Sequence, residues 1–240
     1  MVWHAARRRF TLQLALLLAG VHTARAGAGA ARPGLQSADG RWQIRIDANG
    51  EGVVVHATGD GSLRRAHAAV SLDGRERGRP AAFQAPAARR SFVVAFAGMP
   101  ELWEIPLDPG AEPIFDGYVH DYRMGEAIAK PGFLGVRRTR LEEPLPGPAL
   151  ATHGAYVLGR AADRSTAQGP RAVLVLVHLD VRRTIARFEV DADPDLARAQ
   201  PQVSAADAAG GAARELLVVP DRRGGAPLAI DLRAARLLPR

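Results

Sequence analysis

The residues best suited to bind a ligand lie close together in the middle of the 240-residue sequence. His120 and Met124 are four positions apart, and imidazole and thioether groups are axial ligands of haem iron. Tyr122 and Arg123 stand between them and could contact a planar ligand. A guanidinium can bind a carboxylate through two hydrogen bonds. Four arginines lie within 18 residues and could bind an anionic ligand in this way: Arg123, Arg137, Arg138 and Arg140.

Each of these residues also has a plainer explanation. A histidine in a long loop is usually a surface or turn residue, and His120 beside Asp121 could instead be oriented for proton transfer. The run VRRTRL at 136–141 also fits one solvated face of a strand, in which Arg140 would pair with Glu142 or Glu143. The sequence has no cysteine, which excludes disulfides, thiolate metal sites and c-type haem attachment.

The elements that must position these residues are short strands. Runs rich in Val, Ile, Leu, Phe and Trp alternate with turn signals such as Asp-Gly and Asn-Gly. The clearest runs are 42–46, 53–56, 92–96, 102–105, 155–159, 172–179, 185–190, 216–219 and 227–232. A helix is expected only over 205–215, where Gly210 and Gly211 would interrupt it.

The strand runs group into four repeat units spaced roughly 50–60 residues apart, which is near the length of a propeller blade with insertions. This order predicts an all-β, β-propeller-like fold of the WD40-like or YVTN-like type, partial and with about four blades. A β-sandwich is the alternative. Four blades are the lower limit for a closed propeller, so a small or open propeller and half of a homo-oligomeric ring both fit.

The least generic segment runs from Glu101 to Pro144. It contains ELWEI at 101–105, AEPIFDG at 111–117, VHDYRMGE at 119–126, KPGFL at 130–134 and RRTRLEEPL at 137–145. In this order the motifs resemble the cytochrome d1 domain family, which includes the d1-haem domain of cytochrome cd1 nitrite reductase and relatives in d1-haem biosynthesis. The run VHLDVRRTIA at 177–186 is similar to a strand that follows this loop in such relatives.

The resemblance covers about residues 91–196 and implies a β-propeller that holds a d1-type haem. The implied cofactor-binding residues are His120, Tyr122, Arg123, Arg137 and Arg138, with His120 as the metal ligand. The family propeller has eight blades, whereas four units are visible here. Where relatives continue into Pro-His-Leu, this chain has Pro194-Asp195-Leu196, so a histidine that could face the iron is missing.

Two functions therefore fit the sequence. The first is a periplasmic d1-type haem (tetrapyrrole) binding or maturation protein related to nitrite reductase. The alternative is a non-catalytic, propeller-like interaction module that has lost the cofactor and binds another periplasmic protein. A complete nitrite reductase is not expected, because electron delivery through a c-type haem is excluded. No catalytic residue can be assigned, and the sequence does not decide whether the chain is an enzyme.

The first 26 residues have the three parts of a secretory signal peptide. They are Arg7-Arg8-Arg9, an apolar run over 10–21, and Ala24-Arg25-Ala26. The apolar run is shorter than the roughly 20 residues that span a membrane. The sequence RRRF at 7–10 also fits a twin-arginine signal, so both export routes stay open. We expect a signal peptide over 1–26, a flexible leader over 27–36 and a cytochrome d1-like propeller domain over 37–240, periplasmic and without a membrane span after cleavage.

The high isoelectric point of about 10.9 does not indicate nucleic-acid binding. Without the signal peptide the chain has 28 basic and 25 acidic residues, a net charge of +3. Lys130 is the only lysine, and the arginines alternate with acids along the chain. A nucleic-acid surface needs basic residues clustered on one face.

Three more assignments follow from local context. His178 lies in the apolar run 173–179 and is predicted to be a hydrogen-bonded core residue. Arg89, outside the ligand segment, is predicted to lie on the surface. The stretch 124–135 is predicted to be an irregular loop, because Gly125, Pro131 and Gly132 break regular structure.

Cleavage of the signal peptide is expected directly after Ala26, because small residues stand at positions 24 and 26, three and one residues before the cleaved bond. Amino-terminal sequencing of the exported protein should therefore begin at Gly27. Recovery of the uncleaved chain in the membrane fraction would contradict this prediction. If the signal is of the twin-arginine type, changing Arg7, Arg8 and Arg9 to lysine should block export.

Overall fold

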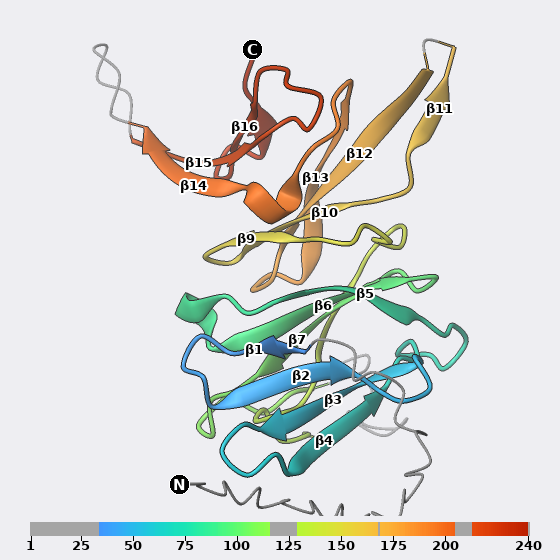
Figure 1. Cartoon of the computed structure of the whole chain (residues 1–240), viewed down its shortest axis with the longest axis vertical. Helices are drawn as coiled ribbons and strands as arrows, with labels where there is room; N and C mark the ends of the chain where they lie inside the picture. The colour runs from blue at the N-terminus through green and yellow to red at the C-terminus, as the bar shows by residue number, and fades with distance from the viewer. Residues whose placement is uncertain (1–33, 116–128, 168, 205–212, 240) are drawn as a thin grey trace, which may run out of the picture. The chain divides into compact units, whose positions relative to one another are not determined.

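A computed structural model describes residues 34–115, 129–167, 169–204 and 213–239. Residues 32–240 form one compact unit, whose regular structure is almost entirely β-strand (Figure 1). The strands form four antiparallel sheets, numbered here in chain order. Sheet 1 contains β1 (Leu35–Gln36), β2 (Trp42–Ile46), β3 (Gly52–Ala57) and β4 (Leu63–Ala68). Sheet 2 contains β5 (Arg79–Gln84), β6 (Ser91–Ala97), β7 (Glu101–Pro106) and β8 (Arg137–Arg140).

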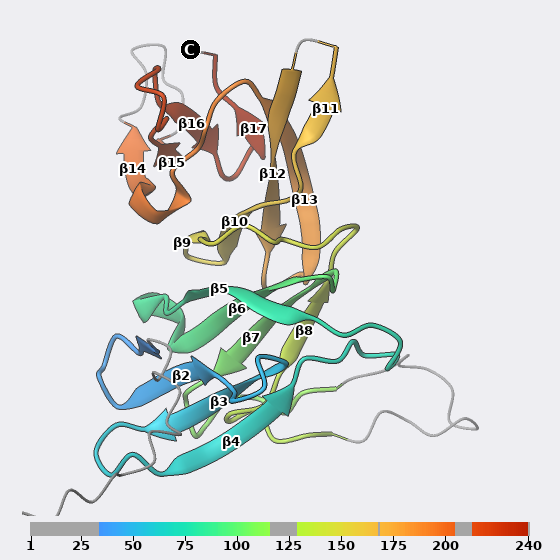
Figure 2. The same ribbon diagram turned by 45° about the vertical axis from the view of Figure 1, so that its right-hand side comes forward.

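Sheet 3 is the largest of the four. It contains β9 (Ala151–His153), β10 (Tyr156–Arg160), β12 (Gly169–His178) and β13 (Arg183–Val190). The ten-residue β12 extends beyond β10 and pairs with β11 (Arg164–Thr166), as Figure 2 shows. Sheet 4 contains β14 (Gln200–Ser204), β15 (Arg214–Val219), β16 (Leu228–Asp231) and β17 (Arg236–Leu237). Two short 3-10 helices, η1 (Ala87–Arg89) and η2 (Leu196–Arg198), precede β6 and β14.

Within each sheet, strands that follow one another in sequence are hydrogen-bonded neighbours, with β11 as the one side branch. Four-stranded meanders repeated along the chain are the blades of a β-propeller. The predicted all-β, propeller-like fold with about four blades is confirmed.

The hydrophobic core lies between the sheets. One cluster joins sheets 1 and 2 and includes Ile44, Phe92 and Trp103. A second joins sheets 2 and 3, and a third joins sheets 3 and 4. Because sheet 2 is covered on both faces, every residue of β7 is buried. Among the described residues, none of these clusters joins sheet 4 to sheet 1.

Each of the nine expected strand runs overlaps one strand of the structure. In chain order these strands are β2, β3, β6, β7, β10, β12, β13, β15 and β16. The strands that were not expected lie at the sheet edges, and none of them is a continuous apolar run. The expected helix is wrong where it can be checked, because β15 begins at Arg214; residues 205–212 lie outside the described part. Sheet 1 also begins before residue 37, because β1 uses the last two residues of the expected leader.

The described part of the stretch expected to be irregular, residues 129–135, contains no strand or helix and makes a single bridge, from Lys130 to Ile114. Throughout the described ranges, no helix reaches the length and apolarity that crossing a membrane requires.

Truncation of a residue between two sheets should be costly. Leu158 is fully buried between sheets 3 and 4. Leu158→Ala should lower the free energy of unfolding by about 2–5 kcal/mol, because it leaves a cavity. Leu63→Ala, at a site that is 56% exposed, is the matched control and should change it by less than about 0.5 kcal/mol. Denaturant unfolding measures both values, and equal effects would contradict the described packing.

Candidate functional site

Three of the five predicted ligand residues, His120, Tyr122 and Arg123, lie outside the described residues. The other two, Arg137 and Arg138, begin β8 and pair in register with Glu104 and Trp103 of β7. Neighbouring residues of a strand point to opposite faces of the sheet. The side chains of the two arginines therefore lie on opposite faces of sheet 2, although the residues are adjacent in sequence.

Arg138 binds a buried carboxylate. Its Nη1 donates to Oε2 of Glu101 at 2.7 Å, and Glu101 is only 6% exposed. The same Oε2 accepts a hydrogen bond from Nε1 of Trp103 at 2.7 Å, while Oε1 accepts from the backbone N–H of Leu72 at 2.8 Å. A buried carboxylate needs such partners to offset its lost hydration. Glu101 therefore joins β7, β8 and the connection between sheets 1 and 2.

The Arg138 guanidinium makes two further contacts. Its Cζ lies 4.5 Å from the centroid of the Trp103 ring, a cation–π geometry, and its Nη1 also donates to the carbonyl oxygen of Val70 at 2.8 Å. Its Nε is buried and has no hydrogen-bond partner among the described residues. Most of this side chain is thus bound within the protein.

The second buried acid of β7 is Glu104, on the face toward sheet 3. Arg89 binds it through Nε to Oε1 at 2.7 Å and Nη2 to Oε2 at 3.1 Å, and the Ser91 hydroxyl donates to Oε1 at 3.0 Å. Arg89 Nη2 also donates to Asp180, in the turn between β12 and β13, at 2.9 Å. Arg137 Nη1 lies 4.0 Å from Glu104 Oε2, an ion-pair distance.

The prediction that Arg89 lies on the surface is wrong. Its side chain is only 15% exposed, because it neutralises Glu104 and connects sheet 2 to sheet 3. The signal that could have shown this is the presence of two acids in the otherwise apolar run ELWEI, since a buried strand tolerates a carboxylate only with a cation beside it. The pairing proposed for Arg140 is also not observed. Glu142 and Glu143 pair with Arg187 instead.

A cavity of about 290 Å³ lies between the turn after β1 and the segment around η1. Its polar lining comes from Ser37, Asp39, Arg90 and Ser91, and Leu107 is among its apolar residues. Hydrogen bonds from the Ser37 hydroxyl and the Arg41 backbone N–H lower the pKa of Asp39. The cavity is slightly smaller than the roughly 300–1,000 Å³ of typical small-molecule sites. Within the described ranges, no group of three acidic or histidine side chains is arranged to hold a metal ion.

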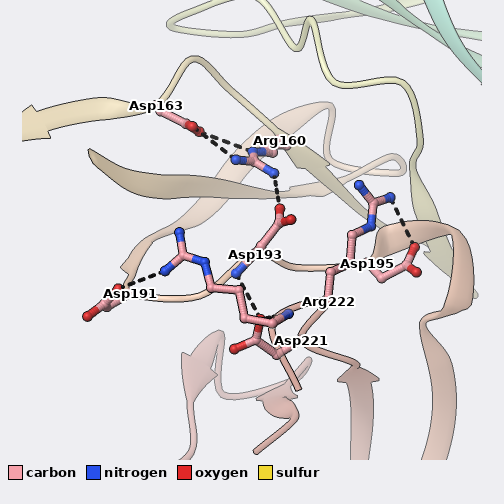
Figure 3. Close-up of polar contacts among 8 residues, drawn as sticks. Arg160, Asp163, Asp191, Asp193, Asp195, Asp221 and Arg222 are labelled. Atoms are coloured by element: carbon pink, nitrogen blue, oxygen red, sulfur yellow. Dashed lines mark hydrogen bonds and ion pairs between the residues drawn. The ribbon is translucent and has the colours of Figure 1, made fainter. Parts of the chain in front are cut away.

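Asp195, at the position where the resemblance to the cytochrome d1 domain family led us to expect a histidine, belongs to a polar joint between sheets 3 and 4 (Figure 3). Arg222 Nη2 donates to its Oδ1 at 3.2 Å. This hydrogen bond, with the charges of Arg222 and Arg198, lowers the pKa of Asp195. The backbone N–H of Asp195 donates to the carbonyl oxygen of Pro220 at 2.8 Å. The aspartate therefore has a structural role at this position.

Three further acids complete the joint. Arg160 binds Asp163 through Nε and Nη2, and its Nη1 reaches Asp193 at 2.8 Å. The backbone N–H of Asp193 in turn donates to Oδ1 of Asp221 at 3.0 Å, as drawn in Figure 3. Every carboxylate of this set thus contacts a cation or a backbone N–H, so the joint connects β10 to the turn after β15.

His178 was predicted to be a hydrogen-bonded core residue, and the structure differs on both points. It is partly buried, with its ring edge-on to Tyr156 at 4.8 Å between centroids. Its Nδ1 is buried without a hydrogen-bond partner among the described residues.

Comparison with solved structures places this geometry among known folds. The chain is similar to "dihydro-heme d1 dehydrogenase NirN in complex with DHE", with 21% identity and a TM-score of 0.57, over 87% of this chain and 37% of that chain. The fold is that of a β-propeller. A β-propeller domain, Cps50 (Swd1) of Myceliophteria thermophila, matches with 14% identity and a TM-score of 0.43, over 88% of this chain and 54% of that one. The tricorn protease matches with 12% identity and a TM-score of 0.39, over 85% of this chain and 23% of that one.

The chain therefore spans little more than a third of the NirN chain that it matches. No protein-family model matches the sequence, and no curated protein is similar to it. The likeness concerns the d1-like propeller fold, and membership of the cytochrome d1 domain family stays a prediction.

Removing Arg89 should destabilise the protein strongly, because Glu104 is only 4% exposed and would remain buried without its main cation. Arg89→Ala should lower the free energy of unfolding by about 3–5 kcal/mol. Asp180→Ala removes the exposed partner of the same arginine and should cost less than about 1 kcal/mol. Chemical unfolding distinguishes the two, and a small effect of Arg89→Ala would refute its role as the neutralising cation.

Proposed function

We propose that this chain is a periplasmic protein that binds a d1-type haem, or a related tetrapyrrole, for storage, delivery or maturation. The observation that supports this most is the structural likeness to a d1-haem dehydrogenase, which covers 87% of this chain. The motifs at 101–144 lead to the same ligand class from the sequence alone. The ligand DHE is bound by that neighbour, and we propose that this chain binds a ligand of the same class.

In this proposal His120 would bind the iron, and Tyr122 and Arg123 would help to hold the ring. Arg137 is the better candidate of the two strand arginines for a ring carboxylate, because Glu104 lies 4.0 Å from it, beyond hydrogen-bond distance. Arg138 is already bound to Glu101 and Val70, so we propose that it positions β8 instead. The haem would supply the redox chemistry, while these residues bind and orient it.

Titration of the mature protein with a d1-type haem, followed by visible absorption, tests the proposal. We expect uptake at micromolar concentration. Arg137→Ala should weaken binding by about one to two orders of magnitude, because a charge-assisted hydrogen bond contributes about 1.5–3 kcal/mol. His120→Ala should shift the absorption bands, because it changes iron ligation.

Arg64→Ala is the control, since Arg64 is an exposed arginine of β4 outside the ligand segment, and it should change neither the affinity nor the spectrum. If the wild-type protein takes up no tetrapyrrole at micromolar concentration, the haem proposal fails.

An interaction module is the second candidate. The observation that favours it concerns the core clusters of the described residues. They join sheet 1 to 2, sheet 2 to 3 and sheet 3 to 4, so one face of sheet 1 and one face of sheet 4 belong to no cluster. A groove of about 590 Å³ on sheet 4 is lined by Ala197, Arg198, Ala199, Gln200, Val218 and Pro220. We propose a second copy of this chain or another periplasmic protein as the partner of such a module.

A further inference from the structure

The connection between β7 and β8 is fixed at its base by hydrogen bonds to two sheets. The backbone N–H of Leu134 donates to the carbonyl oxygen of Pro106 at 2.9 Å. Nε2 of His67, on β4, lies 2.9 Å from the carbonyl oxygen of Leu134. Because a carbonyl oxygen only accepts, Nε2 must carry the proton of this bond. Leu134 is therefore attached to sheet 2 through its N–H and to sheet 1 through its carbonyl group.

Leu134 is also the strained residue of this turn. Its φ of +53° lies in the left-handed region, which bulky residues rarely adopt. The turn is closely packed, because a Cβ on Gly132 would clash with the carbonyl oxygen of Glu112, and one on Gly135 would clash with that of Pro131. The Leu134 side chain is buried in the core between sheets 1 and 2. Burial and the two hydrogen bonds thus maintain a conformation that the backbone does not favour.

His67 sits where a positive charge is unfavourable. Its ring is edge-on to Trp103, with 6.4 Å between the centroids, and the Arg138 guanidinium lies over the same tryptophan. Burial lowers the pKa of His67 to about 4, against the effect of the hydrogen bond to Leu134, and the charges of Arg65 and Arg138 lower it further. Glu101, the acid two residues before Trp103 on β7, is bound to Arg138.

We propose that His67 is a proton-sensitive latch, which holds the strained turn at Leu134 while the ring is neutral and releases it when the ring is protonated. In the released state the ring reaches water, where a histidine has a pKa of about 6.5. Above that pH both states are neutral, and their ratio does not depend on pH. Below it the released state takes up the proton first, so the ratio of latched to released molecules falls about tenfold per pH unit down to about pH 4. The latch concerns the turn alone and does not depend on haem binding.

Hydrogen exchange of single amides in the full mature chain tests the latch. The Leu134 amide should exchange by local opening, with a lower protection factor than the Val175 amide in the centre of β12. Lowering the pH from about 7.5 to about 5.5 should reduce the Leu134 protection factor roughly tenfold. A Leu134 amide whose protection is unchanged, or equals that of Val175 at both pH values, overturns the proposal.

His67→Gln supplies the decisive variant, because glutamine keeps an N–H donor for Leu134 but does not titrate. The pH dependence should vanish in this variant and persist in His56→Gln. His56 lies on β3, the strand next to β4, and its ring contacts the carbonyl oxygen of Gly61. If His67→Gln does not fold, an NMR titration of the wild-type ring decides the question. A His67 pKa near 4 supports the latch, and one near 6.5 overturns it.

Discussion

The arrangement of sheets 1 to 3 depends on how two buried carboxylates on one strand are neutralised. Glu101 and Glu104 of β7 are 6% and 4% exposed, and an ionised carboxylate at such a site is stable only with a cation and further hydrogen bonds. The required partners come from other segments. Arg138 comes from β8, Arg89 comes from η1, and the Leu72 N–H comes from the connection after sheet 1. Since Arg89 also binds Asp180, these contacts connect sheet 2 to both of its neighbours.

This constraint changes the roles of residues that the sequence offered as ligand-binding groups. The arginines near His120 suggested an anion site, but Arg138, one of the two arginines of β8, binds the buried Glu101 inside the protein. The same holds for Asp195, whose contact with Arg222 stabilises the joint between sheets 3 and 4. Both residues therefore have a role in the fold that their position in the sequence did not indicate.

The central strands of the blades could be predicted because they are buried on both faces and are continuous apolar runs, as in β6 and β12. The edge strands could not. The β4 sequence LRRAHA is mostly exposed, and β8 is RRTR, so neither has the apolar pattern of a strand. Partners such as Arg89 and Glu104 are also hidden from sequence, because their contact depends on the order of strands in the sheet. The predicted positions 120, 122 and 123 lie outside the described residues, so that part of the site rests on the motif.

The role of Arg138 in the interior is tested most directly by comparing two adjacent substitutions without any added ligand. Arg138→Met leaves Glu101 buried without its cation, and should lower the free energy of unfolding by about 3–5 kcal/mol. Arg137→Met removes a guanidinium 4.0 Å from an acid that Arg89 already neutralises, and should cost less than about 1 kcal/mol. Equal small losses in denaturant unfolding would contradict this account, because they would mean that Arg138 is not needed to keep Glu101 buried.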